Sequence, residues 1–161
     1  VYNLDHLGLR GLTATILLLL SIYLGWKFET WRPFNLSVIS LLALNAVVGL
    51  AKLEFGRTKP RLNVDLLYAG GMSYPSGHAS NAVLTWGLIA YLYIQYVQPR
   101  LGVIRAASFS VAVISTVVFC VSIFRNTHWI SDLLGGVAIG TALLLLIIAV
   151  DRSIPSRRSN L

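Results

Sequence analysis

Long stretches without a charged side chain alternate with short polar segments along this chain. Five stretches contain no Asp, Glu, Lys or Arg, and they cover residues 11–26, 34–51, 76–99, 106–124 and 133–150. About 20 residues of α-helix cross the apolar core of a bilayer, and these stretches do not alternate in polarity as the strands of a membrane barrel do. We therefore predict an all-α, polytopic membrane helical bundle with five transmembrane helices, and we expect residues 1–161 to form one domain.

The composition agrees with a membrane protein. Hydrophobic residues make up 56% of the 161 residues and charged residues 12%, whereas soluble domains carry about 25% charged residues. Such a chain has too few polar groups to cover a water-facing surface, which excludes a soluble domain and a disordered chain. Cys120 is the only cysteine, so one chain can form neither a disulfide nor a cysteine-based zinc site.

The distribution of Lys and Arg predicts an orientation. The net charge of +7 comes from basic residues between the apolar stretches, where they meet lipid headgroups or an anionic ligand, and nucleic-acid binding is not expected. One face of a five-helix bundle would carry Lys27, Arg32, Arg100, Arg105, Arg152, Arg157 and Arg158; the other would carry Arg10, Lys52, Arg57, Lys59, Arg61 and Arg125. Most basic residues of the second face fall in segments with a functional interpretation. Leaving those out, the bias predicts a cytoplasmic C-terminus and an active site on the extracytoplasmic face of the plasma membrane.

Three segments hold nearly all the ionisable groups that a lipid-buried scaffold does not need: residues 52–61, 74–80 and 122–132. The five-helix topology puts all three on one membrane face, so their cations and histidines are expected to form a pocket for a multiply charged anion. For residues 52–61 alone, an ordinary interfacial belt of basic residues is the alternative interpretation.

The second segment contains Pro75, Ser76, Gly77 and His78 at the start of a predicted helix. Ser76 is a suitable cap, and the free N–H groups of a first helical turn bind anions. His78 would lie in that turn, where it can give a proton to a departing oxygen. The alternative is a capping turn with an interfacial histidine.

The third segment places His128 four residues before Asp132. On a helix the two side chains share a face, so the carboxylate can accept the imidazole N–H and leave the other ring nitrogen free to attack. The alternative is an ion pair that only satisfies itself. A metal site is disfavoured because nearby cations repel a divalent ion, and no metal or other cofactor is expected; these surroundings also argue against haem ligation by His78 and His128.

Together these segments resemble the type 2 phosphatidic-acid phosphatase superfamily, which is related to vanadium haloperoxidases and bacterial acid phosphatases. The family pattern is K-x6-R-P, then P-S-G-H, then S-R-x5-H-x3-D. Lys52 begins the first motif, with Lys59 in place of its arginine, and residues 75–78 match the second in full. His128 and Asp132 match the end of the third.

The third motif departs from the family at its beginning, where Val121 and Ser122 stand in place of Ser-Arg. Arg125 lies three residues further on, and if the helix continues it would reach the same phosphate oxygens. The family core has six membrane helices, so five helices fit if one more precedes Val1.

The resemblance implies a membrane lipid phosphatase acting on a phosphate monoester or pyrophosphate of a polyprenyl or glycerophospholipid. His128 would be the nucleophile, Asp132 would orient it and His78 would protonate the leaving group. The substrate-binding residues would be Lys52, Arg57, Lys59, Ser76, Gly77 and Arg125. Two alternatives stay open: a lipid phosphotransferase using the same phosphohistidine, and a non-catalytic lipid-phosphate-binding protein with a degenerate site.

Three polar side chains within the apolar stretches, those of Asn45, Asn81 and Thr85, also have predicted roles. Asn45 is expected to make an interhelical hydrogen bond. Asn81 and Thr85 share a helical face with His78 and are candidates to line the site.

Overall fold

The computed structural model describes residues 6–155, and this part contains five long α-helices, two short 3-10 helices and no β-strand. The elements are η1 (His6–Gly8), α2 (Arg10–Lys27), α3 (Arg32–Phe55), η2 (Pro60–Leu62), α4 (Gly77–Tyr96), α5 (Leu101–Phe124) and α6 (Ile130–Ser153). The prediction of an all-α fold with five long helices is confirmed. Arg157 and Arg158, which entered the orientation argument, lie outside the described residues.

Three segments in the described part are long and apolar enough to cross a membrane by length and composition. They are Arg32–Leu62, Leu101–Phe124 and Ile130–Ser153, with hydropathies of 2.0, 2.3 and 2.7. Large apolar side chains such as Leu19, Leu42 and Leu145 point outward from the bundle and are more than half exposed. A surface of this kind faces lipid, so the chain is an integral membrane protein, while five crossings remain a prediction.

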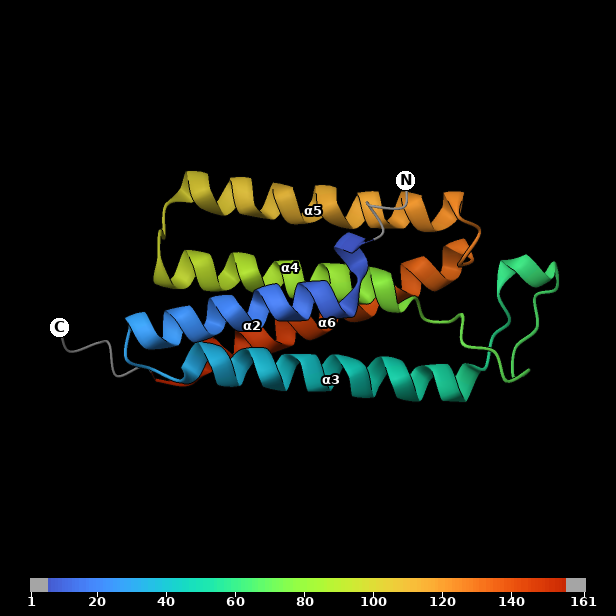
Figure 1. Cartoon of the computed structure of the whole chain (residues 1–161), viewed down its shortest axis with the longest axis horizontal. Coiled ribbons are helices and arrows are strands. Elements are labelled where there is room, and N and C mark those ends of the chain that lie inside the picture. Colours follow the sequence, from blue (N-terminus) through green and yellow to red (C-terminus); the bar gives the residue numbers. More distant parts are fainter. Residues whose placement is uncertain (1–5, 156–161) are drawn as a thin grey trace.

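The long helices run side by side along one axis, with α4 between α5 and the other three helices (Figure 1). Helix α4 packs against all four of the others, and its side chains are buried around most of its circumference. Leu84 and Leu88 are fully buried there, in a core shared with Leu17 of α2, Leu44 of α3 and Ile147 of α6. The central helix is therefore the element against which the others are positioned.

Glycines of α6 bring this helix unusually close to α4. A Cβ atom placed on Gly140 would lie 2.6 Å from the carbonyl oxygen of Ser80 and 3.1 Å from Cβ of Val83, and one on Gly136 would meet the carbonyl of Ser76. Small residues spaced four apart allow such close approach of membrane helices. The contact matters for chemistry because α4 begins with Gly77 and His78, and α6 begins shortly before Asp132.

We expect Gly140→Ala to lower the unfolding free energy by about 1–3 kcal/mol, because the added methyl group meets backbone atoms that cannot rotate away. Thermal unfolding in detergent measures the effect. Gly102→Ala on α5 is the matched control, since a Cβ there meets nothing within 4 Å. Equal stability of the two variants would contradict the close packing of α4 on α6.

Candidate active site

Five chain segments meet at one end of the bundle, because successive helices run in opposite directions. Helices α2, α4 and α6 begin at this end, α3 and α5 end there, and the connection between α3 and α4 extends beyond it (Figure 1). A cavity of about 510 Å³ opens here between α2, α3 and α4. Its lining consists of Leu9, Arg10, Gly11, Gly49, Lys52, Lys59, Met72, Gly77, His78 and His128. The structure thus brings together both histidines, both lysines and Gly77 of the predicted site.

His128 is held against Asp132, although not by the helical geometry expected from the sequence. Helix α6 begins at Ile130, so His128 lies two residues before the helix and the prediction that it shares a helical face with Asp132 is corrected. Its Nδ1 lies 3.5 Å from Oδ2 of Asp132, whose side chain is 0% exposed. With Nδ1 facing the carboxylate, Nε2 is the ring nitrogen left for a ligand.

The Asp132 carboxylate accepts hydrogen bonds from several elements at once. The Trp129 N–H donates to Oδ2 over 3.0 Å, and the hydroxyl of Ser73 donates to the same oxygen. Ser73 also lies 3.5 Å from Nδ1 of His128. These contacts fix the carboxylate, and through it the orientation of the imidazole ring.

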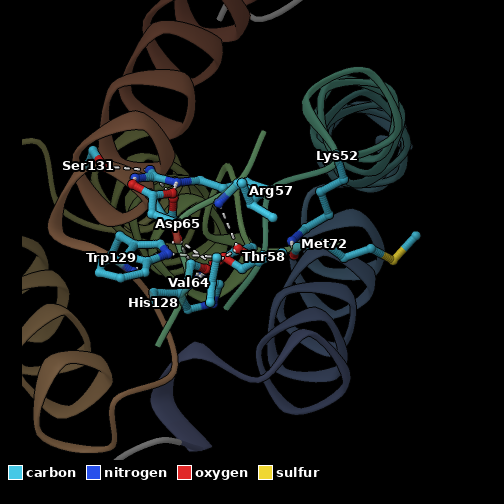
Figure 2. Close-up of polar contacts among 12 residues, drawn as sticks. Lys52, Arg57, Thr58, Val64, Asp65, Met72, His128, Trp129 and Ser131 are labelled. Atoms are coloured by element: carbon cyan, nitrogen blue, oxygen red, sulfur yellow. Dashed lines mark hydrogen bonds and ion pairs between the residues drawn. The ribbon is translucent and has the colours of Figure 1, made fainter. Parts of the chain in front are cut away.

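Arg57 donates to the other oxygen of the Asp132 carboxylate, and its side chain extends toward Asp65 and Ser131 (Figure 2). Its Nη1 donates to Oδ1 of Asp132 over 2.8 Å and to the hydroxyl of Ser131 over 2.6 Å. Its Nε and Nη2 bind both oxygens of Asp65 over 2.7 Å each, and the guanidinium lies 5.5 Å from the centre of the Trp129 ring. Arg57 is not among the residues that line the cavity of His128.

Asp65 is the exposed partner of this arginine. Its hydrogen bonds with Arg57 hold the pKa of Asp65 below its usual range, so the carboxylate is ionised at neutral pH and offsets one positive charge of the site.

The start of α4 has the geometry predicted for an anion site. The Ala79 N–H donates to the hydroxyl of Ser76 over 3.4 Å, so Ser76 caps the helix. Ser76 is fully buried, and its own N–H donates to the carbonyl of Asp132 over 2.8 Å, which ties α4 to α6. First-turn N–H groups have no partner inside their helix; those of Gly77 and His78 lie where these two residues line the cavity.

The connection between α3 and α4 folds back on itself, carries Lys59 and contacts Lys52 at the end of α3. The Tyr68 N–H donates to the carbonyl of Phe55, and the Ser73 N–H donates to the carbonyl of Arg57. Lys52, in the last turn of α3, donates from Nζ to the carbonyl of Met72 in this connection (Figure 2). Lys59 precedes η2 and lines the cavity from the loop.

Arg125 was expected to reach the phosphate oxygens if its helix continued, and the helix does not continue. Helix α5 ends at Phe124, Arg125 caps its C-terminus and Asn126 adopts a positive φ of 52°. The helix therefore does not continue, and Arg125 is not among the cavity-lining residues.

Asn81 and Thr85 are also placed differently from the expectation. Asn81 donates to Oγ1 of Thr13 over 2.7 Å and to the carbonyl of Gly8, and Thr85 donates to the carbonyl of Asn81. Asn81 is buried against α2 and η1, and Thr85 is buried one turn further along α4, so neither side chain lines the cavity.

Three residues of the site region were missed at the sequence level: Arg10, Asp65 and Ser73. Arg10 carried the one available signal, a charge at the edge of the first apolar stretch, directly before Gly11. Asp65 and Ser73 belong to the connection between α3 and α4, where no hydrophobic periodicity predicts how the chain folds.

Comparison with known proteins gives a consistent result. The model of the PAP2 superfamily matches residues 9–154. The chain is 24% identical over 154 residues to phosphatidylglycerophosphatase B of Bacillus subtilis (strain 168), covering 94% of this chain and 74% of that protein. The crystal structure of a transmembrane PAP2-type phosphatidylglycerolphosphate phosphatase from Bacillus subtilis superposes with a TM-score of 0.85 at 21% identity, covering 98% of this chain and 77% of that one. With nearly its whole length matched by the family model, the chain belongs to the PAP2 superfamily.

Proposed function

We propose that this protein is an integral-membrane lipid phosphatase that removes phosphate from a lipid monoester or pyrophosphate through a phosphohistidine intermediate. The observation that carries the proposal is that His78, His128, Lys52 and Lys59 line one cavity, with Nδ1 of His128 3.5 Å from Oδ2 of Asp132. Family membership and the phosphatase named among its relatives support the same reaction class.

In the first half of the reaction, Nε2 of His128 attacks phosphorus and a P–N bond forms as the bond to the leaving oxygen breaks. His78 gives its proton to that oxygen, which departs as the lipid alcohol or, from a pyrophosphate, as the lipid monophosphate. The Asp132 carboxylate accepts the Nδ1–H of His128 and stabilises the charge that develops on the ring.

In the second half, water attacks the phosphohistidine. His78, now neutral, accepts a proton from this water, the P–N bond breaks and inorganic phosphate leaves. Its departure restores the starting protonation states of both histidines.

The fixed cations of the cavity take the part that metal ions play in other phosphoryl-transfer enzymes. Lys52 and Lys59, together with the first-turn N–H groups of Gly77 and His78, would hold the equatorial oxygens as charge spreads over them. Lys59 offers a point charge where the family has the two-pronged arginine. Arg57 is proposed as a positioning residue for Asp132, because Asp65, Ser131 and Asp132 already engage its guanidinium.

The location of the cavity defines the substrate class. It lies at the end of a bundle with an apolar outer surface, so a lipid phosphate can stay in the bilayer while its headgroup enters. We propose five crossings, with this end on the extracytoplasmic side and the C-terminus in the cytoplasm, as the distribution of Lys and Arg outside the site indicates.

The test is phosphate release from a panel of lipid phosphates: polyprenyl mono- and pyrophosphate, phosphatidic acid and phosphatidylglycerol phosphate. We expect release from at least one, unchanged by EDTA because protein cations neutralise the transition state, and abolished by orthovanadate, which mimics five-coordinate phosphorus. Inhibition by EDTA that added metal reverses, or the absence of release from every lipid, would contradict the proposal.

A further inference from the structure

A third basic side chain lines the cavity and comes from a part of the chain outside the three motifs. Arg10 begins α2, whereas Lys52 and Lys59 belong to α3 and to the loop after it. It therefore approaches the cavity from another side than the two lysines.

Two contacts fix where the Arg10 guanidinium lies. A Cβ atom added to Gly77 would lie 2.6 Å from Nη2 of Arg10, so the guanidinium sits directly against the start of α4. On its other side, Nη1 donates to Oδ1 of Asn45 in α3 over 2.8 Å, and Nδ2 of Asn45 donates to the carbonyl of Leu41. The interhelical hydrogen bond expected for Asn45 is thus confirmed, and its partner is a cavity residue.

The surroundings of Arg10 are electrostatically unfavourable for a residue with no anionic ligand. Arg10 is close enough to Lys52 and His78 to disfavour a positive charge on either side chain, and no carboxylate is among the lining residues of the cavity. An interfacial arginine with no ligand would extend toward the headgroups and away from these charges. Asn45 holds it in place instead, with Nη2 beside the first-turn N–H groups of α4.

We propose that Arg10, positioned by Asn45, is a phosphate-binding residue of this site and supplies the guanidinium that the third motif lacks. Ser122 stands at the motif position and is 2% exposed, and Arg125 is outside the cavity lining. A guanidinium offers a planar fork of two parallel N–H donors that matches two phosphate oxygens, a geometry that the ammonium groups of Lys52 and Lys59 lack. The inference rests on the proposed phosphatase function and adds a residue to its site.

The experiment compares Arg10→Gln and Arg10→Lys with Arg61→Gln, an exposed arginine at the same end of the bundle whose Nη2 donates to the carbonyl of Arg125. Phosphate release should fall about 100-fold in Arg10→Gln, mostly in kcat, and about tenfold in Arg10→Lys, while Arg61→Gln stays within about twofold of the parent. Guanidinium ion added to Arg10→Ala should restore part of the activity, which a merely structural role would not allow. Full activity of Arg10→Gln would overturn the inference.

A binding measurement keeps this test independent of turnover. Orthovanadate should raise the Tm of the parent protein and of Arg61→Gln, and raise that of Arg10→Gln much less. Equal shifts in all three proteins would overturn the role of Arg10 even if every lipid substrate failed. If the parent releases phosphate and Arg10→Gln is equally active, the role of Arg10 alone is excluded. If the parent shows no phosphate release and no vanadate shift in Tm, both proposals are excluded.

Asn45→Leu tests the positioning step, because it keeps Arg10 and removes only its hydrogen-bond partner. We expect a loss of activity of about tenfold, and no additional loss when Asn45→Leu is combined with Arg10→Gln. Independent, multiplying losses would show that Asn45 acts through something other than Arg10.

Discussion

His128→Ala is expected to abolish phosphate release, with a loss on the order of 10⁵-fold or more, since it removes the atom that forms the new bond to phosphorus. The cations and helix N-terminus of the cavity remain, so the variant should still bind inorganic phosphate, as measured by a shift in Tm. Loss of turnover with retained anion binding separates removal of the nucleophile from a damaged fold.

His78→Ala provides the matched comparison, because it removes the other imidazole of the same cavity. With a substrate labelled on phosphorus and carrying a leaving group that needs no proton, this variant should accumulate acid-labile, base-stable label on the protein. His128→Ala should acquire none. Label on His128→Ala, or turnover near that of the parent, would show that another residue is the nucleophile.

The proximity of the two histidines can be predicted from the order of the helices along the chain. A chain that crosses an apolar layer repeatedly places alternate connections on the same side, so the end of α3, the start of α4 and the start of α6 must lie together. Charge-free stretches are enough to locate these helices. Several helix ends extend past the stretches because residues such as Arg10, Lys27 and Lys52 continue a helix into the polar region, whereas α4 lies inside its stretch.

The contacts of individual side chains were less predictable. Arg57 belongs to the basic segment by sequence, and only the fold of residues 56–76 shows that Asp65 and Asp132 share its guanidinium. His128 and Asp132 were paired correctly from their spacing, but their geometry depends on a helix that begins at Ile130.

The position of Arg10 depends on how α2 packs beside α3 and α4, because its contacts are to Asn45 and Gly77. No spacing along the chain encodes such packing. The same limit explains Asn81, which was expected to line the site with His78 but packs on Thr13 and Gly8 instead.

Asp132→Asn is expected to reduce kcat by about 10³–10⁴-fold, although it changes one oxygen to an NH₂ group of nearly equal size. Both carboxylate oxygens accept hydrogen bonds: Oδ1 from Arg57, and Oδ2 from Ser73 and the Trp129 N–H. Either orientation of the amide therefore places an NH₂ group against a donor in a fully buried position. The loss of an acceptor at Nδ1 of His128 lets the imidazole turn or adopt the tautomer in which Nε2 is protonated and cannot attack.

Asp65→Asn separates this effect from a general disturbance of Arg57. Asp65 is the other carboxylate of that arginine, but its side chain is 46% exposed, so its loss should change kcat by less than about fivefold. The cavity cations are unchanged in both variants, and both should retain binding of inorganic phosphate, while the rate at which label appears on His128 falls only in Asp132→Asn. If that rate were unaffected in Asp132→Asn, the carboxylate would not orient the nucleophile, and its network with Ser73, Trp129 and Arg57 would serve only to join α6 to the connection between α3 and α4.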